Sequence, residues 1–310
     1  MLAAARASLA RQPLAAGYLA ALAAVIVTAA YPAVTRVSVI TTLTPADLLM
    51  LRFGVSALLF APYLVWRAAA IPRRIWSVGL PLSFFQGWGM AGCAIFGLQY
   101  APASHSAALG PGTISVWVAA LGFLCYGLRI DRAKSLAIGL IVAGIALILA
   151  SSFGGLSTAR AATGDAMFLA ASILGAAYLV YLQQHRFDAV LGAALVSAYS
   201  AVILLPWYLL AAHSNLAAAP IAELAWQVLF QGLLMGCGVF LAVNYAVLAL
   251  GSQTAGVLFA LVPALGLVFS LAITNDPVSP LEWAAIGAIS VGVAVGARPI
   301  ATKAASTLQP

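Results

Sequence analysis

Charged residues are scarce in this chain of 310 residues. They make up 7% of the sequence, whereas 64% of it is hydrophobic and the mean hydropathy is +1.08. A soluble protein carries about 25% charged residues, so this chain has too few to cover a water-exposed surface. At about 20 apolar residues per membrane-spanning helix, the hydrophobic residues suffice for about ten spans and leave no soluble domain. The composition therefore excludes a water-soluble enzyme and predicts a polytopic membrane protein.

Cysteine and histidine are also rare, with three of each. The cysteines all fall in apolar runs, where they are expected to be small buried hydrophobes: Cys93, Cys125 and Cys237. Their spacing fits neither a disulfide framework nor a metal site. The histidines lie in different parts of the chain: His105, His185 and His213. We therefore predict no catalytic residue, no metal and no cofactor, and a membrane-embedded enzyme is the least favoured alternative.

Ten apolar runs follow one another along the chain, separated by charged, proline-bearing or glycine-bearing breaks. They lie near residues 14–35, 46–66, 75–99, 103–127, 133–151, 165–183, 189–212, 224–249, 253–274 and 282–298. This pattern predicts an all-α polytopic membrane protein with ten transmembrane helices. The first run is expected to be a retained helix rather than a cleaved signal peptide, because its removal would spoil the charge asymmetry described next.

Basic residues divide unequally between the two sides of this ten-span scheme. Eleven of the fourteen Lys and Arg residues lie in one set of loops and the two tails. The other side holds only Arg36 and Arg160, together with five of the seven acids. Because cytoplasmic loops accumulate basic residues, both termini are expected in the cytoplasm, in a multi-pass protein of the inner (plasma) membrane. The net charge of +7 follows from the same bias and does not indicate nucleic-acid binding.

The two halves of the sequence resemble each other. Residues 85–101 align with 230–246 with six identities in seventeen positions, including the triplet Phe-Gln-Gly in both. Further on, 136–149 align with 284–297, and two glycine pairs coincide. Each half holds five expected spans, and an odd number places the halves in opposite orientations, as in the inverted repeats of secondary transporters. The predicted units are a first five-helix repeat at 1–155, a second at 163–300 and a cytoplasmic tail at 301–310.

Several stretches resemble the EamA-type branch of the drug/metabolite transporter superfamily. Pro45–Leu59 is similar to the family's second helix, and Gly164–Tyr181 to its sixth helix with the Gly-Asp opening. The sequence departs from the family at Val27 and Thr28, where a Trp-Gly pair is usual. The resemblance implies ten helices and the export or exchange of small metabolites, with amino acids prominent among them.

Polar side chains inside spans are candidate substrate-binding residues, because an unpaired polar group in a membrane is costly. Gln86 lies near the middle of its span and Gln231 is its repeat mate, so two amides are expected to face one cavity; the alternative is hydrogen bonding between helices. Asn244, the repeat mate of Gln99, is a candidate for substrate binding, for a gate or for capping a helix end. Four aromatic residues are expected to line a pocket, with packing between helices as the alternative: Trp88, Tyr31, Tyr178 and Phe259.

Two further residues carry charge or can acquire it. Arg52 lies about 10 Å into its span, where it either pairs with Asp47 and the outer helix ends or captures a substrate carboxylate. His105 is a possible proton-linked switch, against the alternative of a surface residue at a helix start. No Asp or Glu falls clearly at the middle of a span, which argues against an acidic site for ion coupling.

Backbone-breaking residues interrupt two repeat-related spans. The fourth contains Gly110, Pro111 and Gly112, and the ninth contains Pro263. A missing amide and glycine flexibility unwind a helix where it lines a cavity, so these residues are hinge or gate candidates, with a packed kink as the alternative.

Taken together, these patterns predict a secondary carrier that exports or exchanges a small amphipathic organic solute by alternating access. A solute sensor or a channel is the alternative. The expected partners are the small-molecule substrate and the lipid bilayer, with no nucleic acid, and the chain is expected to be a monomer or weak homodimer.

Overall fold

The computed structural model describes residues 14–126, 132–152, 158–185, 188–250, 254, 258–276 and 278–296. Throughout these ranges the regular structure is helical, and no strand occurs in them. Six helical segments are long and apolar enough to cross a membrane: Leu14–Thr41, Pro45–Ala70, Lys134–Ser151, Arg160–Tyr181, Val190–Leu210 and Ile221–Ala246. Apolar helices that are shorter occupy Val262–Thr274 and Pro280–Gly296.

The first half of the chain contains both long and interrupted helices. In order they are α2 (Leu14–Thr41), α3 (Pro45–Arg67), η1 (Ala68–Ala70), α4 (Arg73–Leu82), η2 (Ser83–Trp88), α5 (Gly89–Gly97), α6 (Ala103–Leu109), η3 (Pro111–Thr113), α7 (Ile114–Tyr126) and α8 (Arg132–Ser152). The predicted spans at 75–99 and 103–127 are divided into these shorter pieces, so neither contains a single helix of spanning length.

The second half repeats this pattern. Its elements are α9 (Thr158–His185), α10 (Ala189–Leu210), α11 (Ile221–Gln227), η4 (Val228–Gly238), α12 (Val239–Leu250), α14 (Val262–Phe269), η5 (Ser270–Thr274) and α15 (Pro280–Gly296). In η2 two helical pieces meet at a kink, with Gly87 outside the helical region, whereas η4 is π-helical. The alignment of the two Phe-Gln-Gly triplets places Ser83 on Val228, so these two irregular segments begin at the same position of each repeat.

Local sequence signals fix several helix starts. Thr44 and Asp47 form a capping box at the start of α3, where Pro45 takes the first helical position. Ser279 and Glu282 make the same reciprocal contacts at the start of α15, with both N···O distances at 3.3 Å. Such boxes satisfy amides that would otherwise lack partners at a helix N-terminus.

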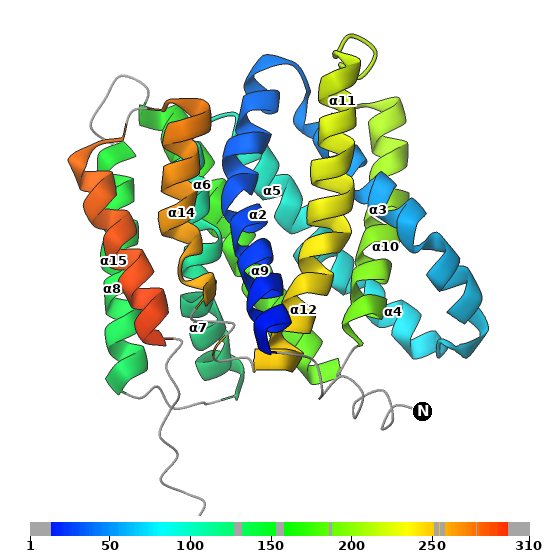
Figure 1. The fold of residues 1–310 in the computed structure, drawn as a ribbon, viewed down its shortest axis with the longest axis horizontal. Coiled ribbons are helices and arrows are strands. Elements are labelled where there is room, and N and C mark those ends of the chain that lie inside the picture. Colours follow the sequence, from blue (N-terminus) through cyan, green and yellow to red (C-terminus); the bar gives the residue numbers. More distant parts are fainter. Residues whose placement is uncertain are drawn as a thin grey trace, which may run out of the picture.

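Helices α8 and α15 lie side by side at one edge of the bundle and pack through paired glycines (Figure 1). A Cβ atom added to Gly144 would lie 2.5 Å from Ile289 Cγ1, and one added to Gly292 would lie 2.7 Å from Ile141 Cγ1. When the two halves are aligned, Gly144 corresponds to Gly292 and Ile141 corresponds to Ile289, so each contact is the repeat equivalent of the other. This helix pair therefore displays the internal repeat directly. Gly292 is thus used for packing within the chain.

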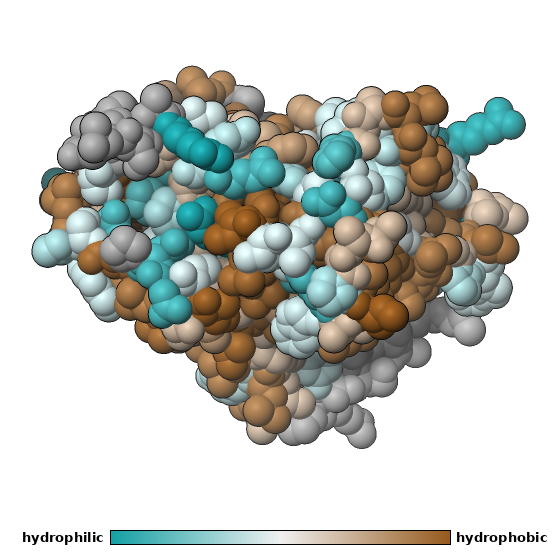
Figure 2. Space-filling model, turned by 90° about the horizontal axis from the view of Figure 1, so that it is seen from above, coloured by the Kyte–Doolittle hydropathy of each residue, from teal (hydrophilic) through white to brown (hydrophobic). Residues whose placement is uncertain are grey.

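The outside of the bundle carries many apolar side chains, and hydrophilic side chains gather at its upper end (Figure 2). Large hydrophobic side chains point outward from several helices; Leu58 and Leu124 are each 75% exposed. Figure 2 shows the end of the bundle that is uppermost in Figure 1, where hydrophilic side chains gather among apolar ones. The first described residue of α2 and the last of α15 both lie at the opposite, lower end (Figure 1).

Candidate functional site

A cavity of about 340 Å³ lies where helices of the two halves meet. The first half lines it with Thr28, Tyr31, Pro32, Arg52, Gln86, Met90, Ala91, Ala94, Ser106, Gly110, Pro111 and Ile114. The second half lines it with Phe168, Ala171, Gly175, Tyr178, Leu179, Met235, Val239, Phe240, Val243, Asn244 and Phe259. The structure therefore brings together many of the residues that the sequence singled out: Tyr31, Arg52, Gln86, Gly110, Pro111, Tyr178, Asn244 and Phe259.

The backbone beside this cavity is irregular. Helix α6 ends at Leu109, and Gly110 leaves the helical region with ψ of −97° before the short turn η3 begins at Pro111. In η2, Gly87 has φ of −90° and ψ of −118°, and the neighbouring Trp88 N–H donates to Ser200 Oγ of α10 at 3.2 Å. Irregular backbone at membrane depth is tolerated where it is buried in protein or lines a cavity, and both conditions hold here.

The two amides of the repeated triplet do not meet in one cavity. Gln86 is half-buried and lines it, whereas Gln231 is fully buried and its Nε2 donates to Thr35 Oγ1 of α2 at 2.9 Å. One turn earlier, Gln227 Nε2 donates to Ser38 Oγ at 2.8 Å. Gln231 thus makes an interhelical hydrogen bond, which was the predicted alternative to substrate binding. Of the two amides, only Gln86 is placed to reach a solute.

Four other predicted residues lie outside the cavity lining: Trp88, Gly112, Pro263 and His105, the last of which is described below. Trp88 packs on Phe84, with ring centroids 4.8 Å apart. Gly112 and Pro263, the hinge candidates from the two halves, are neighbours, because a Cβ added to Gly112 would lie 3.3 Å from Pro263 Cγ. The breaks in the two repeat-related segments therefore pack against each other.

Arg52 is 8% exposed and lines the cavity without an acidic partner in the described part of the chain. Its guanidinium carbon lies 5.2 Å from the ring centroid of Tyr31 and 5.7 Å from that of Phe53. The expected partner Asp47 is engaged elsewhere: its carboxylate accepts from Thr44, Tyr208, Ser214 and Asn215. The predicted ion pair between Arg52 and Asp47 is therefore not present.

His105 is 2% exposed, so the surface alternative was wrong. Its Nδ1 lies 2.8 Å from Asp165 Oδ1 of α9, and its Nε2 lies 3.3 Å from Glu282 Oε1 of α15. The Nε2 contact is at ion-pair distance but lacks hydrogen-bond geometry. The imidazole therefore joins α6 of the first half to two helices of the second.

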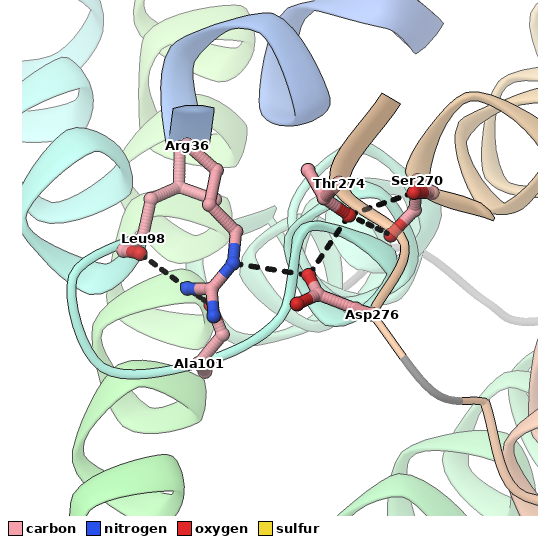
Figure 3. A network of polar contacts seen from close by, with 6 residues as sticks. All are labelled: Arg36, Leu98, Ala101, Ser270, Thr274 and Asp276. Atoms are coloured by element: carbon pink, nitrogen blue, oxygen red, sulfur yellow. Dashed lines mark hydrogen bonds and ion pairs between the residues drawn. The ribbon is translucent and has the colours of Figure 1, made fainter. Parts of the chain in front are cut away.

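A second polar network surrounds Arg36 near the end of α2 (Figure 3). Its Nε donates to Asp276 Oδ2 at 3.0 Å, and one terminal nitrogen donates to the Leu98 and Ala101 carbonyls, both at 2.6 Å. Thr274 Oγ1 donates to the same Asp276 oxygen at 3.0 Å. The Arg36 and Asp276 side chains are only 15% and 16% exposed, so the ion pair is largely shielded from solvent.

Asp47 is the centre of a third network. Its Oδ1 accepts from the Tyr208 hydroxyl at 2.6 Å and the Ser214 hydroxyl at 2.7 Å. Its Oδ2 accepts from the backbone N–H groups of Thr44 at 2.9 Å and Asn215 at 3.0 Å. The carboxylate thereby joins the start of α3 to the end of α10 and the segment that follows it.

All three networks join the first half of the chain to the second, at the upper end of the bundle in Figure 1. The span scheme places these acids on one side but does not predict their partners, which lie 240, 60 and 161 positions away. The available signal was the concentration of acids on one side of the span scheme, together with Arg36 as one of two cations there.

Comparison with known proteins agrees with this arrangement. A crystal structure described only as that of a protein aligns with 92% of this chain and 98% of its own, with 16% identity and a TM-score of 0.60, which shows a shared fold. No curated protein sequence matches the chain. The model of the EamA-like transporter family matches twice, at residues 15–150 and 162–297. The chain therefore belongs to the EamA-like transporter family of the drug/metabolite transporter superfamily, whose members are membrane transporters.

Proposed function

We propose that this chain is a secondary carrier that moves a small amphipathic organic solute, an amino acid or a related compound, across the inner membrane. The observation that carries the proposal is the cavity between the two halves, bordered by irregular backbone in η2 and between α6 and η3. Substrate sites of inverted-repeat carriers lie at the repeat interface and are formed by interrupted helices. The volume of about 340 Å³ is within the range of about 300–1,000 Å³ that holds a small organic ligand.

In this proposal the chain crosses the membrane ten times. The crossings are α2, α3, the run from α4 to α5, the run from α6 to α7, α8, α9, α10, the run from α11 to α12, the segment ending in η5, and α15. The basic loops are cytoplasmic, and both termini face the cytoplasm. The upper end of the bundle in Figure 1 is then the outer end.

Alternating access requires this outer end to open and close around the cavity. The three polar networks that join the halves there belong to the state closed on the outside. Opening separates Arg36 from Asp276, and His105 from the two acids of the second half. At the lower end, Arg67 and Asp188 form an ion pair between the halves, at 3.7 Å and about half exposed. Export follows when solute loads from the inside and these outer contacts then part.

Counterflow in proteoliposomes tests the proposal. Vesicles holding purified protein are loaded with an unlabelled amino acid, sugar, nucleoside, organic acid or quaternary amine, and uptake of the labelled compound is followed with and without a proton gradient. Saturable, solute-specific exchange is expected for a carrier. A channel gives flux without saturation, and a sensor binds solute without moving it, so either result overturns the proposal.

A further inference from the structure

The charge inside the cavity is one-sided. Seven polar side chains line it: Thr28, Tyr31, Arg52, Gln86, Ser106, Tyr178 and Asn244. Among these described residues Arg52 alone is charged, and no acid accompanies it. In a low-dielectric site a single fixed cation attracts an anion and repels a cation far more strongly than it does in water.

Arg52 is also incompletely satisfied. A buried guanidinium without a counter-charge is costly, and the aromatic faces of Tyr31 and Phe53 compensate it only in part. The planar fork of its N–H groups matches the two oxygens of a carboxylate. A bound carboxylate would therefore supply the missing counter-charge and accept several of its hydrogen bonds.

Two further donors lie beside the same cavity on α2. The hydroxyl groups of Thr28 and Tyr31 are one helical turn apart and buried. Thr28 Oγ1 has no hydrogen-bond partner among the described residues, and the Tyr31 hydroxyl lies beside the Arg52 guanidinium, which can donate to it but cannot accept its hydrogen. Buried polar groups in folded proteins are nearly always paired, so two hydroxyl hydrogens without an acceptor in one cavity wall indicate an absent acceptor. An ionised carboxylate offers acceptor positions only, which suits both hydroxyls and the guanidinium together.

The rest of the lining is apolar and aromatic, with Phe168, Phe240 and Phe259 from the second half. These side chains suit a hydrocarbon or aromatic body and offer no second cation for a second anionic group. We propose that Arg52 anchors the carboxylate of the transported solute, so that the cavity selects monocarboxylates with an apolar body. The inference rests on the proposed carrier function, and it makes the carboxylate, not an amino group, the required feature.

Four probes with the same aromatic ring separate the chemistries. They are phenylacetate, its neutral amide phenylacetamide, the cation phenethylamine and the zwitterion phenylalanine. Binding to the purified full chain is measured by ligand-dependent shifts of the melting temperature, and transport by counterflow. Phenylacetate is expected to bind at least about 30-fold more tightly than phenylacetamide and phenethylamine, the effect of one desolvated charge pair. Phenylalanine is expected between these limits, because its carboxylate pairs with Arg52 while its ammonium group meets no acid among the described residues that line the cavity.

Arg52→Gln is expected to remove that preference and to leave the weak binding of phenylacetamide unchanged. Arg52→Lys keeps the charge without the planar fork and should retain part of the preference. Arg160→Gln is the matched control, because Arg160 also lies over an aromatic ring, that of Tyr100 at 5.6 Å, but is exposed and away from the cavity. Removal of an unpaired buried cation should leave the melting temperature of the ligand-free protein unchanged or higher, whereas a structural ion-pairing role would lower it.

The inference is overturned if phenylacetamide binds as tightly as phenylacetate, if Arg52→Gln keeps the preference, or if no probe binds folded protein. Counterflow separates this failure from failure of the carrier itself. Saturable exchange of a neutral or cationic solute with phenylacetate inactive would refute the anion site and leave the carrier standing. Absence of exchange for every class of solute would refute both.

Discussion

The ion pair between Arg36 and Asp276 joins the two halves at the upper end of the bundle in Figure 1, which the proposed topology places outside, so its removal should favour the state that is open at that end. Asp276→Ala deletes a charge-assisted hydrogen bond of 3.0 Å between side chains that are about 85% buried. Hydrogen bonds to charged groups contribute about 1.5–3 kcal/mol. If the contact exists only in the closed state, the open-to-closed ratio rises about 10- to 150-fold. An end that is open about 1% of the time would then be open about 10–60% of the time.

Thiol accessibility measures this shift. Ser106 lines the cavity, so Ser106→Cys in a chain whose native cysteines are replaced by serine reports entry of a membrane-impermeant maleimide. The reagent is added from the side opposite the termini, and the initial labelling rate should rise roughly in proportion to the open population. Asp188→Asn is the matched control, since Arg67 and Asp188 also join the halves but are 3.7 Å apart, with side chains 42% and 53% exposed. Such exposed pairs contribute about 0–1 kcal/mol, so the control should change the labelling rate little. Asparagine removes the charge and keeps the cap that residue 188 makes to the Val190 N–H at the start of α10.

An Asp276→Ala labelling rate equal to that of the parent chain would refute the reasoning, because the contact would then be present in both states or contribute nothing. An equal rise in the Asp188→Asn control would also refute it, because the effect would then be a general loosening of the bundle. Labelling from the side of the termini provides the complementary check, and it should fall as the opposite end opens.

Three other perturbations separate packing from function. Gly144→Leu should lower stability by about 1–3 kcal/mol because the added side chain meets α15 within 3 Å. Gly139→Leu is the control and should not lower stability, because the space at its Cβ position is open; thermal unfolding in detergent compares the two variants. Gln86→Ala should impair counterflow with little loss of stability, whereas Gln231→Ala should cost about 0.6 kcal/mol of stability and leave transport near the parent rate. Equal effects of the two substitutions on transport would contradict the placement of the amides. His105→Ala removes the imidazole that contacts both Asp165 and Glu282 and should lower stability by about 3–5 kcal/mol, measured by the same unfolding assay; an unchanged melting temperature would show that the contacts are not coupled to folding.

The repeat and the helical class were predictable because they depend on local patterns that survive in one sequence. Apolar runs of spanning length specify helices, and the shared triplet at Phe85 and Phe230 identified the equivalent segments. The breaks at Gly110 and Pro111 were also visible, since a glycine or proline acts on its own backbone.

The pairing of side chains across the two halves was not predictable. A one-residue change of depth turns a helical side chain by about 100°, so similar depth in the membrane does not determine which way a residue faces. Gln231 is the example, because it shares its place in the repeat with Gln86 but faces α2 instead of the cavity. The burial of His105 between two acids likewise depends on how three helices meet, and its partners are distant in sequence.

The segments η2 and η4 begin at the same aligned position but differ in their backbone. In η2 two helical pieces meet at a kink, where Gly87 lies outside the helical region, whereas η4 continues from Val228 to Gly238. The shared Phe-Gln-Gly triplet therefore lies on two different backbones, and its two amides have separate uses: Gln86 lines the cavity, and Gln231 donates to Thr35. The internal repeat thus preserves the course of the chain without preserving the task of each aligned residue.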